Sequence, residues 1–158
     1  MDPSTRRRYV SAMSTRSPLY DSDFYAWSRE QARLLRAGEL EGADIENIAE
    51  EIDSMGRAEK RELVSRLTVL LLHLLKWRHQ PDKRGPSWEA SIRVQRDDVE
   101  DHLADNPSLK PLLPQALGSA YRKGRMAAVA ETGMPWSTFP EACPWTAQQA
   151  LDESFWPD

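Results

Sequence analysis

The chain has 158 residues, a length that suits one domain with one hydrophobic core. Hydrophobic residues make up 40% and charged residues 29%, which argues against a disordered chain, and the formal charge of -4 argues against a general nucleic-acid coat. The one cysteine, Cys143, excludes an internal disulfide and a zinc site built mainly on thiolates.

The first 17 residues are basic and polar. Arg6, Arg7 and Arg8 precede Tyr9 and Val10 in a pattern similar to a twin-arginine export signal, but no apolar segment follows them. We therefore expect residues 1–17 to form a flexible basic arm and residues 18–158 to form a single helical domain. We also expect the protein to be cytoplasmic.

A first amphipathic helix is predicted after this arm. Asp21 suits its N-cap, and Gly38 stands where a C-terminal glycine belongs. Its predicted buried stripe has the 3.6-residue period of a helix and consists of Phe24, Trp27, Gln31, Leu34 and Leu35.

A second amphipathic helix follows, with Asp44 at its N-cap and Gly56 expected to end or kink it. Its apolar residues again share one side, which we expect to face the core. This stripe consists of Ile45, Ile48, Ala49, Ile52 and Met55.

Residues 67–77 are apolar on nearly every side of a helix, so we expect other helices to surround this segment. His73 and Lys76 interrupt the segment, which falls well short of the roughly 20 apolar residues that a bilayer requires. The sequence therefore predicts a central buried helix and no membrane-spanning one.

Two further helices and a terminal strap complete the predicted fold. Ser87 suits the N-cap of one helix, which Asn106 ends, and Pro114 suits the first turn of the next, which Gly133 ends. The last 25 residues are rich in proline and aromatic residues and contain a short helix capped by Thr146, which indicates a strap packed on the domain. The predicted fold class is all-α: a single-domain bundle of five to six helices around a central apolar helix.

Several stretches carry a resemblance to a known family. They include residues 20–27 (YDSDFYAW), 31–38 (QARLLRAG), 47–52 (NIAEEI), 73–77 (HLLKW) and 155–157 (FWP). The chain resembles the bacterial domain-of-unknown-function family 29 (DUF29) over roughly residues 19–157, although His79 stands where that family usually has an aromatic residue. The resemblance implies a predominantly helical fold and brings no established activity, substrate or catalytic residue.

Glu51 and His73 are the candidate catalytic residues. Glu51 lies at the edge of the second helix's apolar stripe, and His73 interrupts the central helix, so the two side chains could meet inside the bundle. A buried glutamate–histidine pair suits a metal site or an acid–base pair, but it also serves as a purely structural pair. We expect no bound metal and no cofactor.

A basic stretch is the candidate partner-binding surface. Residues 76–96 contain six basic and two acidic side chains, whereas residues 39–53 contain seven acidic and no basic ones. The two stretches could neutralise one another within or between chains, an interpretation that we prefer to nucleic-acid binding. The candidate residues are Lys76, Arg78, Lys83, Arg84, Arg93 and Arg96.

Three hypotheses for function follow from these features. The first is a non-enzymatic interaction or oligomerisation module, acting as a homo-oligomer or with an unknown protein partner. The second is a small helical enzyme or metal-binding protein that uses a Glu51/His73 pocket. The third is a basic loop that binds phosphate or nucleic acid.

Overall fold

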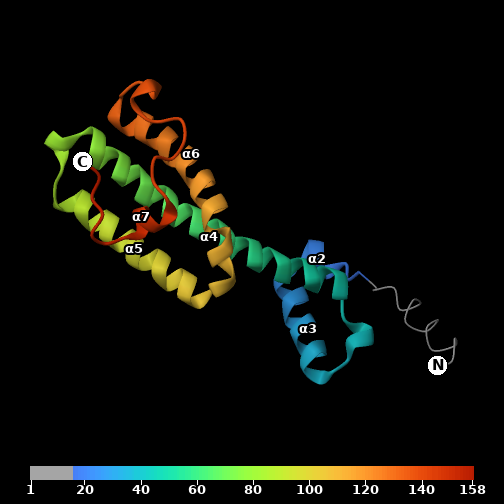
Figure 1. The fold of residues 1–158 in the computed structure, drawn as a ribbon. Coiled ribbons are helices and arrows are strands. Elements are labelled where there is room, and N and C mark those ends of the chain that lie inside the picture. The colour runs from blue at the N-terminus through green and yellow to red at the C-terminus, as the bar shows by residue number, and fades with distance from the viewer. Residues whose placement is uncertain (1–15) are drawn as a thin grey trace, which may run out of the picture. The chain divides into compact units, whose positions relative to one another are not determined.

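The computed structural model describes residues 16–158, which form an all-α structure without strands (Figure 1). The predicted basic arm falls outside the described residues as far as residue 15. The α-helices are α2 (Leu19–Ser22), α3 (Phe24–Ala37), α4 (Ile45–His79), α5 (Pro86–Asp105), α6 (Leu113–Thr132) and α7 (Ala147–Leu151). The 3₁₀ helices are η1 (Leu40–Gly42), η2 (Pro81–Lys83), η3 (Pro107–Leu112) and η4 (Trp136–Thr138).

The chain divides into two compact units, Met1–Arg57 and Ala58–Asp158. The described part of the first unit holds α2, α3, η1 and the first turns of α4, and the second holds the rest of α4 with all later elements. The all-α fold class is confirmed, whereas a single domain over residues 18–158 stays a prediction.

In the first unit the N-cap of α3 differs from the predicted one. The side chain of Asp23, not Asp21, accepts a hydrogen bond from the backbone N–H of Ala26, because Asp21 already belongs to the short helix α2. Gly38 ends α3 with φ at 73°, a left-handed conformation that favours glycine.

Helix α4 continues through Gly56, so the prediction that this glycine ends the helix is wrong. A glycine inside a helix costs about 1 kcal/mol relative to alanine, a small penalty beside the many turns of helix that continue on both sides.

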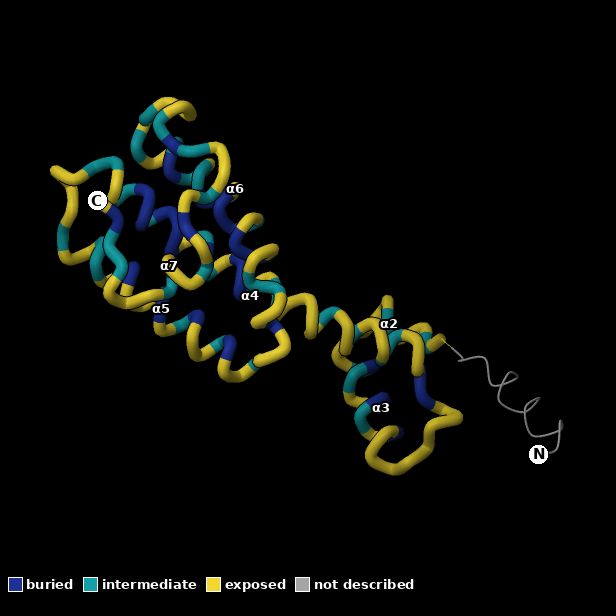
Figure 2. The backbone as a smooth tube through the Cα atoms, viewed as in Figure 1, coloured by how far each residue is buried: buried dark blue, intermediate teal, exposed yellow. Residues whose placement is uncertain are grey.

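The predicted central helix forms the core of the second unit. Leu67, Leu70, Leu71, Leu74 and Leu75 are completely buried, and Figure 2 shows the buried positions of this unit on α4, α5 and α6. One side of this helical segment is not covered, because Val69 is exposed and His73 is only half-buried. The other members of the core are Leu63, Val64, Leu72, Ile92, Val99, Leu103, Leu109, Ala116, Leu117, Ala120, Tyr121, Ala128, Phe139, Trp145 and Ala150.

Helices α6 and α4 approach closely at Gly124. A Cβ atom at this position would lie 3.2 Å from the carbonyl oxygen of Thr68 and 3.3 Å from the backbone nitrogen of Leu72. Backbone atoms inside a helix have little freedom to move aside, so the close packing of the two helices depends on a residue without a side chain.

The C-terminal strap packs on the second unit, as predicted. Phe139 and Trp145 are buried in the core, and α7 begins with a capping box in which Thr146 and Gln149 each bond the other's backbone N–H. The predicted cap of α5 is wrong, since Gly85 holds that position and Ser87 lies within the first turn. Among residues 16–158, no helix has the length and apolar character needed to span a bilayer.

Candidate functional site

The first turns of α4 expose an apolar stripe. Ile45, Ile52 and Met55 are exposed by 46%, 63% and 69%, Ala49 is also exposed, and Ile48 is half-buried. These positions were predicted to face the core, and that prediction is wrong for most of them; the same turns are largely yellow in Figure 2. A run of large apolar side chains on one face of a helix is a common feature of interaction surfaces.

The stripe is exposed because α4 turns its polar side toward the rest of the first unit. Asn47, Glu51 and Ser54 follow one another at helical spacing on the side away from Ile45, Ala49 and Ile52, and all three are partly buried. Asn47 donates a hydrogen bond to Asp44, and Glu51 accepts one from the hydroxyl of Tyr20. Polar contacts therefore hold this part of α4 in place, and its apolar side remains in solvent.

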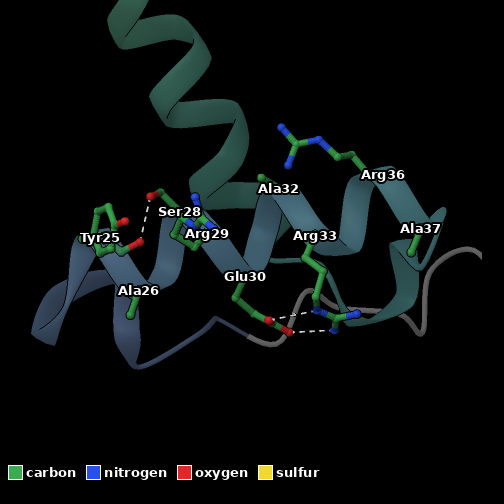
Figure 3. A pocket seen from close by; sticks show the side chains of 9 residues that line it. All are labelled: Tyr25, Ala26, Ser28, Arg29, Glu30, Ala32, Arg33, Arg36 and Ala37. Carbon is green, nitrogen blue, oxygen red and sulfur yellow. Dashed lines mark hydrogen bonds and ion pairs between the residues drawn. The ribbon is translucent and has the colours of Figure 1, made fainter.

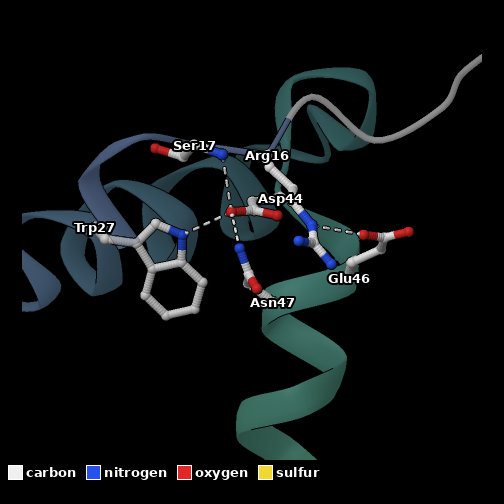
Figure 4. A network of polar contacts seen from close by, with 6 residues as sticks. All are labelled: Arg16, Ser17, Trp27, Asp44, Glu46 and Asn47. Carbon is white, nitrogen blue, oxygen red and sulfur yellow. Dashed lines mark hydrogen bonds and ion pairs between the residues drawn. The ribbon is translucent and has the colours of Figure 1, made fainter. Parts of the chain in front are cut away.

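Asp44 is the centre of these polar contacts (Figure 4). Its carboxylate oxygen Oδ2 accepts hydrogen bonds from Ser17 N at 3.0 Å, Trp27 Nε1 at 3.1 Å and Asn47 Nδ2 at 2.8 Å. Burial by itself would raise the pKa of Asp44, but the hydrogen bonds from Asn47, Ser17 and Trp27 outweigh it and lower that pKa. The side chain, only 1% exposed, thus joins the start of the described chain, α3 and α4 as a buried carboxylate.

Three aromatic rings from α2 and α3 pack on one another, and one of them, Trp27, bonds Asp44. Tyr20 meets Trp27 edge-on with ring centroids 4.9 Å apart, and Phe24 stacks on Trp27 at 5.3 Å. The hydrogen bond from Tyr20 to the Glu51 carboxylate raises the pKa of Tyr20 to about 12, with smaller contributions from burial and from the charge of Glu51. These contacts fix α4 against α2 and α3, and so they also fix the direction of the apolar stripe.

Acidic side chains line one edge of the apolar stripe. Glu46 and Asp53 lie seven residues apart on the same side of α4, with Glu50 between them, and all three are exposed. Glu46 pairs with Arg16 at 3.0 Å and Glu50 pairs with Arg57 at 2.7 Å, both in the open solvent. Exposed pairs of this kind contribute little to stability and exchange readily, so these carboxylates are free to change partners.

Helix α3 presents a basic face that is open to solvent (Figure 3), and all the residues that line it belong to this one helix. We call this face the basic hollow. Arg29 and Arg36 lie seven residues apart on the side that also carries Tyr25 and Ala32. Arg33 pairs with Glu30 at 2.9 Å, and Arg36 extends away from that pair in Figure 3. The remaining lining residues are Ala26, Ser28 and Ala37.

The predicted contact between Glu51 and His73 is not formed. Both residues lie on α4, about six turns apart, because Gly56 does not end the helix. Glu51 belongs to the first unit, whereas His73 belongs to the second and has its Nδ1 atom 2.8 Å from the carbonyl oxygen of Val69. A catalytic or metal-binding role for Glu51 and His73 therefore stays a prediction.

Arg96 from the predicted basic surface is buried instead, with 3% exposure. Its guanidinium donates hydrogen bonds to the carbonyl oxygens of Ala150 at 2.9 Å and Phe155 at 2.7 Å, and it lies over the ring of Trp156. Burial lowers the pKa of Arg96, but an arginine stays charged at any ordinary pH. Arg96 cannot meet a partner while the C-terminal strap is in place, and its role is to hold that strap.

The other basic residues of this surface differ in the contacts that their side chains make. Lys76 pairs with Glu131 at 2.8 Å and lies over the Trp88 ring, and Arg84 donates to the carbonyl oxygen of Trp77 at 2.7 Å. Arg93 pairs with Glu89 at 3.0 Å. Arg78 and Lys83 are exposed. Partner binding by this stretch stays a prediction.

The second unit also contains a smaller pocket of about 390 Å³. Its walls include Trp136, whose ring lies under Arg125, and Cys143, whose thiol pKa is raised by burial. A protonated thiol is a poor nucleophile and a poor metal ligand. No cluster of three or more histidine, cysteine or acidic side chains that could hold a metal exists in the part of the chain that the structure describes, and the expectation of no metal and no cofactor stays a prediction.

Sequence reasoning missed both surfaces of the first unit. The signals for the first surface are the acidic residues on the edge of the α4 stripe and the polar Asn47 and Ser54 on the side away from it. The signal for the second surface is the helical face that Arg29 and Arg36 share. Both signals are spacings of charged and polar residues within a helix, which apolar periodicity alone does not reveal.

Comparison with known proteins gives one result. No curated protein and no solved structure matches the chain. A family model does match residues 19–156, which is nearly the whole of the described chain and the region in which the resemblance was seen. The chain belongs to the family described as domain of unknown function DUF29.

Proposed function

We propose that this chain is an oligomerisation module, in which the N-terminal unit associates with the same unit of a second copy. The observation that supports it most is the exposed apolar stripe on α4, formed by Ile45, Ile52 and Met55 with Ala49 between them. Large apolar side chains in water are costly, and a second chain that covers them would recover that free energy.

The exposed stripe has the spacing that one helix presents to another. Ile45, Ile48, Ile52 and Met55 alternate by three and four residues, the pattern of apolar positions at a helix–helix seam. The seam extends over about three turns, so it is short, and association through it should be moderate and depend on concentration. Symmetric self-association is also the commonest form of assembly among proteins.

Sedimentation velocity of the full chain over a range of concentrations tests this proposal. We expect the wild-type weight-average sedimentation coefficient to rise with concentration in the micromolar range. Ile52→Ser combined with Met55→Ser removes apolar area that association would bury, on the order of 2 kcal/mol or about thirtyfold in Kd. The doubly substituted chain should therefore sediment as a monomer.

A matched control separates the stripe from exposed apolar residues in general. Val94→Ser changes an exposed apolar residue of α5 in the other unit, and it should leave the sedimentation behaviour unchanged. The stripe residues are exposed, so their substitution should change the free energy of unfolding little, which thermal denaturation followed by circular dichroism checks. A wild-type chain that remains monomeric to several hundred micromolar would rule the proposal out.

A further inference from the structure

We infer that the α4 stripe of one copy docks into the basic hollow of α3 on a second copy, with Glu46 and Asp53 facing Arg29 and Arg36. This inference rests on the proposed function and names the surface that receives the stripe. Both surfaces belong to the first unit, and the second copy of this chain is the occupant that each of them fits.

Charge is the first reason for this pairing. The described residues of α4 as far as Asp53 carry Glu46, Glu50, Glu51 and Asp53 and no basic side chain. The face of α3 that forms the hollow carries three arginines and a single glutamate, Glu30. The two surfaces therefore have opposite charge, which favours their approach and selects one partner surface over others.

Spacing is the second reason. Glu46 and Asp53 are separated by one heptad, as are Arg29 and Arg36, so both pairs span about 10.5 Å along their helices. The two acids can therefore meet the two arginines at the same time. The stripe and the hollow also have similar lengths, since residues 45–55 and residues 25–37 each extend over about 15 to 18 Å.

Side-chain size is the third reason. Ala32 lies between Arg29 and Arg36 on this face of α3, whereas the stripe carries three isoleucines and a methionine beside Ala49. Large side chains on one helix pack best against small side chains on the facing helix, because the two surfaces then interlock without voids. The aliphatic stems of Arg29 and Arg36 would cover the edges of the contact.

Pairing of the stripe with the stripe of a second copy is less favourable. In such a pair Glu46 and Asp53, each one position after a seam residue, would lie outside the seam and meet no basic side chain. The pair would therefore lack the opposite charges that favour one partner surface over others.

Charge reversal and mixing test the docking arrangement. Variant A carries Glu46→Arg and Asp53→Arg, and variant B carries Arg29→Glu and Arg36→Glu. Each variant alone would place like charges in the contact, so we expect its self-association to weaken by about tenfold or more in sedimentation equilibrium. An equimolar mixture of A and B restores opposite charges at both contacts and should associate at least as strongly as the wild type.

The mixture is the decisive measurement, because a variant that had lost its fold would not recover on addition of the other. A chain that carries all four substitutions provides a second check and should self-associate like the wild type. Unchanged association of variant B, or no recovery in the mixture, would overturn the inference while leaving the proposed function intact if Ile52→Ser with Met55→Ser still yields monomers. Loss of association in B alone, with A unaffected, would also overturn it.

Discussion

The side chain of Arg96 donates a hydrogen bond to the backbone carbonyl of Phe155 at 2.7 Å, from the middle of α5 to the end of the chain. The same guanidinium bonds the carbonyl of Ala150, the last buried residue of α7. A single side chain thus supplies donors for two carbonyls of a segment that forms no sheet and only a short helix. The C-terminal strap depends on a charged residue for much of its fixation.

Replacement of Arg96 by alanine should destabilise the second unit by about 3 kcal/mol, because the buried carbonyls of Ala150 and Phe155 would lose their partner. Arg96→Lys should recover only part of this loss, since an ammonium lacks the planar fork of a guanidinium. Chemical denaturation followed by tryptophan fluorescence measures the change.

Arg93 provides the control for that substitution. It also belongs to α5 and lies over the ring of Trp156, but its side chain is exposed. Arg93→Ala should cost less than about 1 kcal/mol. If both substitutions lowered the free energy of unfolding equally, the buried hydrogen bonds of Arg96 would not stabilise the strap more than an exposed arginine does.

Gly124→Ala should destabilise the chain by about 1 to 3 kcal/mol, because the new Cβ atom would press on the backbone of α4 at Thr68 and Leu72. Gly118 lies on the same helix, and a Cβ added there would meet nothing within 4 Å. Gly118→Ala should therefore stabilise the chain by about 0.5 to 1 kcal/mol through helix propensity alone. Thermal unfolding of both variants under one set of conditions compares them, and a neutral Gly124→Ala would contradict the close approach of α6 and α4.

The hydrogen bond between Tyr20 and Glu51 should make the first unit sensitive to alkaline pH. In the folded chain the pKa of Tyr20 is raised from 10.0 to about 12, so the folded state keeps the hydroxyl proton that the unfolded state releases above pH 10. The associated stability is present in full below pH 10 and is lost as the pH rises toward 12. Tyr20→Phe should remove this dependence.

The measurement is the free energy of unfolding from pH 8 to 12 for the wild type and Tyr20→Phe. Tyr121 also has a pKa raised to about 12, chiefly by burial, but it is present in both proteins, so the difference between the two curves reports Tyr20. Parallel curves would mean that the bond to Glu51 does not persist in solution.

The sequence predicted the second unit well because its helices obey simple rules. The run of leucines around Leu71 is buried, Gly133 and Asn106 end helices as expected, and Thr146 caps α7. In each case the deciding forces act within one helix or through non-directional burial, so they can be seen in the order of the residues.

The first unit was predicted poorly because its arrangement depends on directional contacts between distant residues. No local sequence pattern around Asp44 predicts that its carboxylate accepts hydrogen bonds from Ser17, Trp27 and Asn47. These bonds turn the polar side of α4 inward. The expected meeting of Glu51 with His73 failed for a related reason, since it assumed a break at Gly56.

The inward-facing polar side of α4 also has a thermal consequence. The heat capacity of a protein rises on unfolding mainly because apolar surface becomes hydrated, and Ile45, Ile52 and Met55 are already hydrated in the folded chain. Unfolding of the first unit should therefore change the heat capacity less per residue than unfolding of the second. Its stability should consequently vary less steeply with temperature, with cooling weakening it less than it weakens the leucine-rich core around Leu71.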